Sequence, residues 1–211
     1  RNGGQPIDYS MAEACARRVA ESIEKTTIGT LTGITYGAGQ YGGYGRTSKV
    51  YGYTNFPSRI TKTDLTVPTG SNPEATVNDV LSMRSLLYAN NMFGPYMVYH
   101  STDWDQFMDN DYARLGGNNP SQTLRNRIRS IEGILDVRRL DYLTSSTNPY
   151  TLLVIQMSSD VARAVRGLSM TTVQWESKGG LQLNFKVMAI MVPQLRADYY
   201  GHCGICHGTT S

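Results

Sequence analysis

Cysteine and long apolar runs are both scarce in this 211-residue chain. Only three cysteines occur, and only Cys203 and Cys206 are close neighbours, so the sequence predicts no disulfide framework. No apolar run approaches the roughly 18 residues that span a bilayer. The first residues, RNGGQPIDYS, also lack the apolar core of a signal peptide. We therefore expect no membrane partner.

An excess of charge of one sign is also lacking, because 20 basic and 17 acidic residues give a net charge of only +3. No run of Lys or Arg forms an arm that would bind nucleic acid electrostatically. What the chain does have is a hydrophobic content of 40%, which is enough for the core of one large domain or two small ones. The composition is therefore typical of a globular protein.

Residues 35–59 are rich in glycine and tyrosine, and Gly37, Gly39 and Gly42 match the dinucleotide-binding spacing G-x-G-x-x-G. That motif works only where its glycines turn a buried strand into a helix. Here the end of a helical pattern precedes the glycines, and no helical apolar period follows them. We therefore reject the nucleotide site and interpret the segment as a mobile loop.

Apolar periodicity and turn residues predict an α+β fold without internal repeats. The first helix begins with a capping box and is expected to bury Cys15, Val19 and Ile23 on one face. The pair Gly179-Gly180 between two apolar runs predicts a β-hairpin. Further helical segments are expected over residues 71–91, 102–110, 120–133 and 158–168, and strands over residues 59–69, 94–100, 134–143, 150–157, 171–177 and 181–195.

Side chains suited to catalysis are few, which favours a non-enzymatic role. His100 ends an apolar strand and is interpreted as a hydrogen-bonded residue at the strand end. Aspartates gather at Asp103, Asp105, Asp109 and Asp111, but without the glycine and terminal Glu of a calcium loop. We interpret this cluster as a solvated helix face with an acidic first turn.

The C-terminal segment HCGICHG is the strongest candidate for a metal site, with His202, Cys203, Cys206 and His207 as possible ligands. Structural zinc sites draw their ligands from two separated segments, whereas these four are all local. If the segment is a strand, adjacent side chains also point to opposite faces. We expect a terminal strand with partly buried thiols, and no metal or cofactor. A metal-binding enzyme using these residues and His100 is the least favoured alternative.

Four segments, in this order, carry a resemblance to a known family. They are DYSMAEACARRVAESIEKTTIG, GYTNFP, PEATVNDVLSMRSLLYANNMFGPYMVYHSTDWDQFM and TVQWESKGGLQLNFKVMAIMVPQLRADYYGHCGICHG. They resemble the spine helix, the segment after it, the second peripheral helix leading into the axial domain, and the long closing hairpin of tailed-phage major capsid proteins. That family has the Hong Kong 97-type fold and includes the encapsulins. The likeness covers roughly residues 9 to 207 and involves no catalytic signature.

The resemblance implies a peripheral domain over residues 1–93, with the spine helix at about 9–27, an axial domain over 94–189 and a return strand over 190–211. The family also has an N-terminal arm and an extended E-loop before the spine helix. Only eight residues precede Tyr9, so both are expected to be absent from this chain. The implied function is that of a non-enzymatic capsid subunit, assembled in the host cytoplasm into the icosahedral virion shell around double-stranded DNA.

The partners implied are further copies in pentamers and hexamers, decoration, scaffolding or portal proteins, and DNA bound without sequence specificity. An encapsulin-type compartment shell is the alternative function. Tyrosines of the Gly/Tyr segment are expected to contact neighbouring subunits, as interface aromatics do. Arginines are expected to pair across subunits, to face DNA or to lie on a solvated helix face. The candidates are Tyr36, Tyr41, Tyr44, Tyr51, Tyr53, Arg125, Arg127, Arg129, Arg138 and Arg139.

Overall fold

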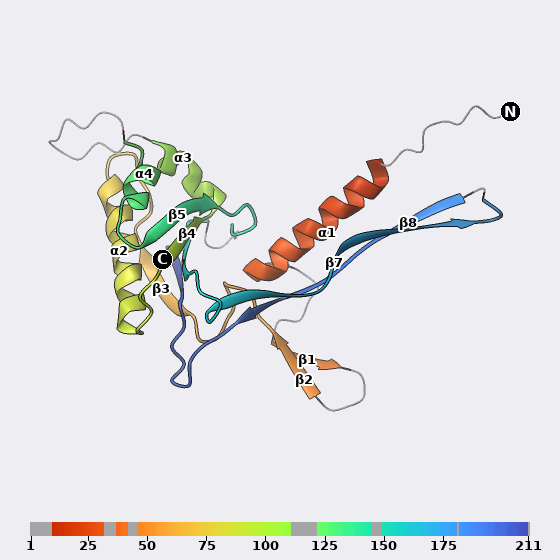
Figure 1. The fold of residues 1–211 in the computed structure, drawn as a ribbon. Helices are drawn as coiled ribbons and strands as arrows, with labels where there is room; N and C mark the ends of the chain where they lie inside the picture. Colours follow the sequence, from red (N-terminus) through yellow and green to blue (C-terminus); the bar gives the residue numbers. More distant parts are fainter. Residues whose placement is uncertain are drawn as a thin grey trace.

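The computed structural model describes residues 10–31, 37–41, 46–110, 122–144, 149–180 and 182–210, with side chains left out for 37–41 and 46–49. Figure 1 shows two parts. A body contains a five-stranded sheet and helices, and a long hairpin projects from it with one helix alongside. None of the described helices is long and apolar enough to cross a membrane.

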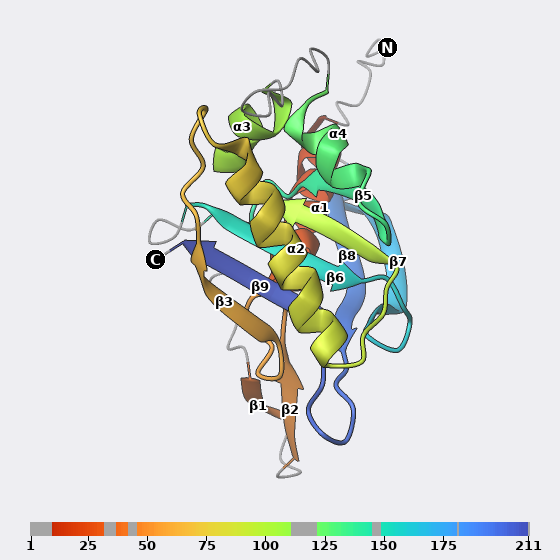
Figure 2. The ribbon, with the colours of Figure 1, turned by 90° about the vertical axis from the view of Figure 1, so that its left-hand side faces the viewer.

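Strand β6 (Thr151–Gln156) forms the centre of the body. Its sequence TLLVIQ is apolar almost throughout and its first five residues are buried, as expected for a strand covered on both faces. It pairs antiparallel with β4 (Tyr96–His100) and with β9 (Ile205–Thr210). Strands β3 (Ile60–Leu65) and β5 (Ile134–Arg139) add in parallel at the edges (Figure 2).

Four helical elements belong to the body, and each confirms a segment predicted as helical. Helix α2 (Pro73–Ala89) crosses one face of the sheet (Figure 2), and η1 (Thr102–Trp104), α3 (Asp105–Asp109) and α4 (Leu124–Arg129) lie near one end of α2. Together they close a core that includes Met83, Trp104 and Ile128. Because side chains alternate along a strand, β6 supplies both this core and a second one on the other face of the sheet.

Strands β7 (Ala162–Ser177) and β8 (Gln182–Leu195) form one long antiparallel hairpin, which confirms the hairpin predicted around Gly179-Gly180. The helix predicted over residues 158–168 is wrong. Only a single turn forms, in which the carbonyl of Ser158 accepts from the amides of Val161 and Ala162. Residues 162–166 then pair with residues 191–195. This long-range pairing overrides the local helix signal, since helix propensity is a weak preference.

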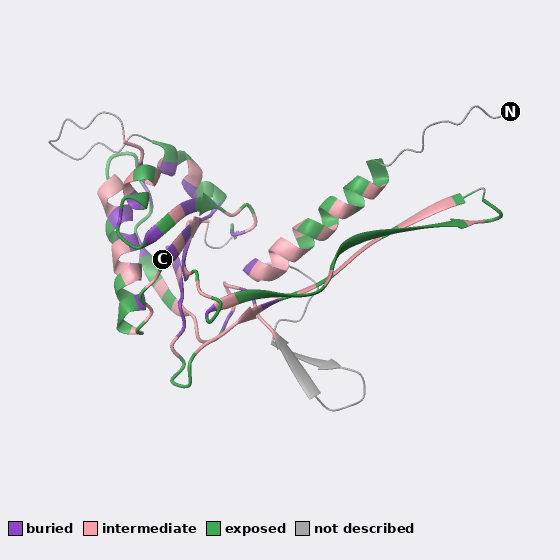
Figure 3. Cartoon of the chain, in the orientation of Figure 1, coloured by how far each residue is buried: buried purple, intermediate pink, exposed green. Residues whose placement is uncertain are grey.

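Helix α1 (Ser10–Ile28) confirms the first predicted helix and lies along the hairpin (Figure 1). Its predicted buried face is largely open, because Cys15 is exposed and Val19 and Ile23 are only half-buried. Ile28, at the end of the helix, is its one buried residue. The physical reason is that α1 packs on a two-stranded ribbon, which covers less of a helix than the body would (Figure 3).

The glycine- and tyrosine-rich segment contains regular structure where a loop was expected. Strand β1 (Gly37–Tyr41) pairs antiparallel with β2 (Arg46–Val50). These two strands contain tyrosine, threonine and valine as well as glycine, and the first three residue types favour extended backbone.

The elements do not group along the expected boundaries at residues 93/94 and 189/190. Helix α2 and strand β9 lie outside residues 94–189, yet α2 and Cys206 of β9 share a core with β4 and β6. Strand β7 and most of β8 lie inside that range and project from the body (Figure 1). The chain therefore groups into the body and an arm, by which we mean α1 with β7 and β8. Sequence order could not show this, because core contacts join elements that are distant along the chain.

Candidate assembly surface

The face of the hairpin toward α1 is partly filled by that helix. Ala20 and Ile23 of α1 line a groove of about 310 Å³ together with Ala189 and Met191 of β8. Residues 166 and 168–170 of β7 complete the lining. Because successive side chains of a strand point to opposite faces, residues 190 and 192 of β8 point away from α1.

The opposite face of the hairpin carries exposed apolar side chains. Residues paired directly in a regular antiparallel ladder share a face. On either side of the register shifts around Leu168, Val165 pairs with Val192, Val173 with Lys186 and Trp175 with Asn184. The even-numbered residues of β8 therefore share this face with three residues of β7. We refer to its large apolar residues as the outer stripe: Val165 (47% exposed), Val173 (42%), Trp175 (47%), Ile190 (60%) and Val192 (43%).

The outer stripe has the properties of a surface that another protein covers. Full burial of an aliphatic side chain stabilises by about 1.5–3 kcal/mol, and these side chains have gained only part of that in the single chain. The exposed apolar residues follow one face of the hairpin, with Asn184 and Lys186 among them, whereas single exposed apolar residues are normal for a monomer. The hairpin also has open strand edges, which can pair with a further strand.

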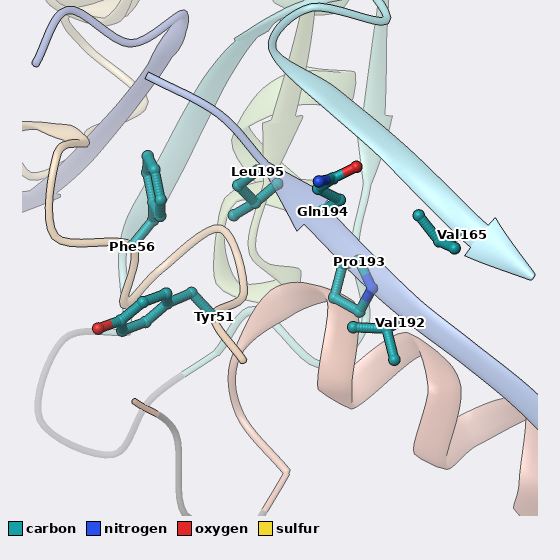
Figure 4. Close-up of a pocket in the computed structure, with 7 residues that line it drawn as sticks. All are labelled: Tyr51, Phe56, Val165, Val192, Pro193, Gln194 and Leu195. Carbon is teal, nitrogen blue, oxygen red and sulfur yellow. The ribbon is translucent and has the colours of Figure 1, made fainter. Parts of the chain in front are cut away.

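A pocket of about 460 Å³ lies where the hairpin leaves the body (Figure 4). Tyr51 and Phe56 form one side of it, with their rings edge to face at 5.9 Å between centroids. Val165 and Val192 belong to both the pocket and the outer stripe, so the two surfaces are continuous. The lining residues are Tyr51, Phe56, Val165, Val192, Pro193, Gln194 and Leu195.

Two of the five tyrosines expected at subunit contacts pack within their own chain. Tyr51 and Tyr53 are half-buried against the second core. Burial raises the pKa of the Tyr53 hydroxyl, with a smaller contribution from Tyr99. Tyr51 also lines the pocket shown in Figure 4. Tyr36 and Tyr44 lie outside the described residues, as does the side chain of Tyr41, so their expected role stays a prediction.

Four of the five candidate arginines form ion pairs within the chain. Arg125 and Arg139 both bind Asp105, at 2.9 and 2.7 Å. Arg129 and Arg138 both bind Asp136, at 3.1 and 3.0 Å. The remaining one, Arg127, donates to the hydroxyl of Ser130. The aspartates therefore pair with arginines across elements of the body, which local sequence patterns could not show.

Asp105 is the most connected carboxylate of this ion-pair network. Its partial burial alone would raise its pKa, but hydrogen bonds from Arg139 and Arg125 outweigh that effect and hold the pKa below its ordinary value. Asp136 also has a lowered pKa, chiefly because of the hydrogen bond from Arg138. Both carboxylates are therefore ionised at neutral pH, and each partly offsets the charge of the two arginines that it binds.

The sequence of residues 30–208 matches the model of a family of unknown function, DUF6260. The chain belongs to this family. No curated protein matches the chain. Membership of DUF6260 by itself assigns no activity.

Several solved structures share the fold of this DUF6260 chain. The virus-like particle from Pyrococcus furiosus is 15% identical, with a TM-score of 0.54 over 74% of this chain and 58% of that one. A chain of Mycobacterium phage Che8 is 10% identical, with a TM-score of 0.51 over 72% of this chain and 53% of that one. The likeness to the Hong Kong 97-type α+β fold is thus confirmed. The DUF6260 chain spans a little over half the length of either structure.

The C-terminal histidines and cysteines lie in different environments. His202 binds Asp198 at 3.0 Å, whereas Nδ1 of His207 accepts a hydrogen bond from Arg59 at 3.4 Å. Cys203 belongs to one core of the body and Cys206 to the other, on opposite faces of the sheet. Burial raises the pKa of Cys203 to about 11 and that of Cys206 to about 12. Among the described residues, no three His, Cys, Asp or Glu side chains gather into a metal-binding group.

The histidine at the end of β4 makes a hydrogen bond, as expected for this strand-end residue, and it is buried. Nδ1 of His100 lies 3.0 Å from the carbonyl oxygen of Ser101. Burial lowers the pKa of His100, so the ring is neutral at physiological pH.

The exposed pair Tyr199 and Tyr200 is a surface feature that sequence reasoning missed. These side chains are 96% and 81% exposed in the link between β8 and β9. The sequence does contain a signal for this surface turn, namely two adjacent tyrosines before Gly201, flanked by Asp198 and His202. Polar and turn-forming neighbours of this kind indicate a surface turn rather than the end of a strand.

Proposed function

We propose that this chain is a structural subunit of a closed icosahedral shell, the capsid that surrounds the double-stranded DNA of a tailed phage. The single observation that carries the proposal is the outer stripe on a hairpin that projects from the body. This surface needs a covering partner, and in a shell that partner is another copy of the chain. The role is structural rather than catalytic.

The arm suits assembly because it is poorly covered by its own chain. An isolated two-stranded ribbon is marginally stable in water and gains stability from a further layer or strand. Here α1 covers one face of the hairpin, and the outer stripe lies on the other. A contact between the arm of one copy and a different surface of the next is heterologous, and repeated contacts of this kind close into rings and shells. Pentamers and hexamers are the rings expected in such a shell.

The likeness in fold to a virus-like particle and to a phage chain supports this proposal. In the terms of the Hong Kong 97-type fold, we propose that α1 is the spine helix and that it forms the peripheral domain with β7 and β8. The body then corresponds to the axial domain. This assignment replaces the sequence-based boundaries with the observed grouping of elements.

The paired arginines support loose rather than specific contact with DNA. Arg125, Arg129, Arg138 and Arg139 are held by carboxylates of the same chain. Affinity for DNA depends on cations free to replace counterions at phosphates. A net charge of +3 with paired arginines therefore fits a container for DNA that another machine packages. The shell would be assembled in the host cytoplasm and found in the virion, where scaffolding, decoration and portal proteins are further candidate partners.

Imaging native particles that contain this chain by cryo-electron microscopy, together with extraction of nuclease-protected nucleic acid, tests the proposal. We expect icosahedral shells with tails that protect double-stranded DNA, and the outer stripe buried between subunits. Tailless shells filled with protein would assign the chain to an encapsulin-type compartment instead. A chain that remains monomeric at high concentration and is found in no particle would overturn the proposal.

A further inference from the structure

Tyr199 and Tyr200 are the most exposed large apolar side chains among the described residues. They lie in residues 198–202, which we refer to as the tyrosine turn, within the dark blue loop at the bottom of Figure 1. Their rings meet edge to face, with centroids 5.6 Å apart. Tyrosine contributes a large contact area with a polar end, which is why it is enriched at protein interfaces.

The tyrosine turn is held in one shape by its own hydrogen bonds. The carboxylate of Asp198 accepts from the His202 amide at 2.7 Å and lies 3.0 Å from Nδ1 of the same residue. The amide of Asp198 donates to the carbonyl of His202, and the amide of Gly201 donates to the carbonyl of Asp198. The ring of His202 also lies 6.0 Å from that of Tyr200. A turn ordered before binding loses little conformational entropy when it binds.

The same chain offers a concave surface of matching chemistry. The pocket of about 460 Å³ at the base of the hairpin has apolar walls from Phe56, Val165 and Leu195. Tyr51 and Gln194 add polar groups that can bond a phenolic hydroxyl. The pocket is also continuous with the outer stripe, so an occupant would cover both surfaces together. Tyr199 and Tyr200 of the same chain do not fill this pocket, because their side chains are 96% and 81% exposed.

We propose that the tyrosine turn of one copy inserts into the pocket between Tyr51, Phe56 and Leu195 of a neighbouring copy. A protruding aromatic turn and an aromatic-lined pocket on different surfaces of one chain form a heterologous contact, the kind that propagates from copy to copy. The occupant is therefore a second copy of this chain. The inference rests on the proposed shell function and names a contact within it.

Cross-linking between two differently tagged chains tests this contact, with Cys15→Ser in both. One chain carries Tyr199→Cys and the other carries Val165→Cys, and the two are mixed, assembled and oxidised. We expect a disulfide-linked dimer that contains both tags. A matched pair with Tyr199→Cys and Thr172→Cys, the latter on the other face of β7, should give no such dimer. Particles that form without a disulfide between positions 199 and 165 would overturn the inference and leave the shell function standing.

Assembly of alanine variants gives a second, independent test of this contact. The double variant Tyr199→Ala/Tyr200→Ala should raise the subunit concentration needed for assembly by about tenfold or more, as loss of interface aromatics does. Leu135→Ala removes an apolar side chain that is 56% exposed on β5 and should change that concentration less than about twofold. Equal effects of the two changes would contradict the inference. If the unaltered chain does not assemble and the 199/165 cysteine pair does not cross-link, the inference and the proposed function both fail.

Discussion

Asp105 joins three elements of the body through two ion pairs. It lies at the start of α3 and binds Arg125 of α4 and Arg139 of β5. Its pKa is lower in the folded chain than the ordinary value, so the unfolded chain takes up a proton first as the pH falls. The stability contributed by Asp105 is therefore present above its unfolded pKa of about 3.9 and is lost as the pH falls through its folded pKa.

Asp105→Asn should lower the free energy of unfolding by about 1–2 kcal/mol at neutral pH, since two charge-assisted hydrogen bonds lose their ionised acceptor. The difference from the unaltered protein should shrink at about pH 3, where the carboxylate of the unaltered protein is itself becoming protonated. Urea unfolding at both pH values measures it. The control is Asp103→Asn, an exposed carboxylate nearby in η1. A difference that stays the same at both pH values would contradict the prediction.

The three cysteines should differ strongly in reactivity. Cys15 is exposed, whereas Cys203 and Cys206 are buried, with thiol pKa values raised to about 11 and about 12. The thiolate is the reactive form, so the two buried thiols are both inaccessible and protonated at about pH 8. We expect iodoacetamide to label Cys15 alone in the folded chain, and all three cysteines in urea. Mass spectrometry of the peptides measures this, and equal labelling in the folded chain would refute it.

At the scale of elements, the junction between α1 and the body depends on close approach of two backbone segments. The amides of Tyr53 and Thr54 donate to the carbonyls of Thr27 and Ile28 at 3.0 and 2.9 Å. A Cβ added to Gly52 would lie 2.3 Å from the amide nitrogen of Gly29. Glycine is therefore required at residue 52 because backbone, rather than a movable side chain, occupies the space.

Gly52→Ala should destabilise the chain by about 3 kcal/mol or more, the upper range for an overpacked site, because neither backbone segment can move without breaking these bonds. Gly70→Ala is the matched control, since a Cβ there meets nothing within 4 Å, and it should change stability by less than about 0.5 kcal/mol. Thermal unfolding followed by circular dichroism compares the two. Similar melting temperatures for both variants would show that the junction is not tight.

At the scale of the whole molecule, the body and the arm differ in how far one chain buries their apolar side chains. The body buries its two cores within one chain, whereas the arm leaves one face of its hairpin open. Figure 3 shows this contrast, with buried residues gathered in the body and exposed ones along the arm. Folding of the body and assembly through the arm should therefore be separable by mutation.

Ile190→Glu places a charge in the outer stripe at its most exposed residue. We expect a folded chain with an unchanged circular dichroism spectrum that forms no particles, because burying an unpaired carboxylate at a contact is costly. Val67→Glu, at an exposed position in the body, should leave assembly intact. Light scattering and electron microscopy measure both. Normal shells from the Ile190→Glu chain would exclude the outer stripe as a subunit contact.

Much of the fold could be predicted from the sequence, because its signals are local. The sequence SMAE at residues 10–13, the apolar run of β6 and the glycines at 179 and 180 are signals that each involve a few neighbouring residues. These signals correctly predicted the α+β class, the first helix, the central strand and the hairpin. The order of the elements was enough to indicate the Hong Kong 97-type fold, which similarity to solved structures then confirmed.

Three features of the chain were decided only by the tertiary structure, because each depends on residues far apart in sequence. Residues 162–166 became strand rather than helix because residues 191–195 pair with them. Asp105 accepts from arginines 20 and 34 residues away, which the pattern of aspartates could not show. The outer stripe became visible only when α1 was seen to cover the other face of the hairpin. Local pattern determines which elements form, whereas packing determines which of their faces remain open for a partner.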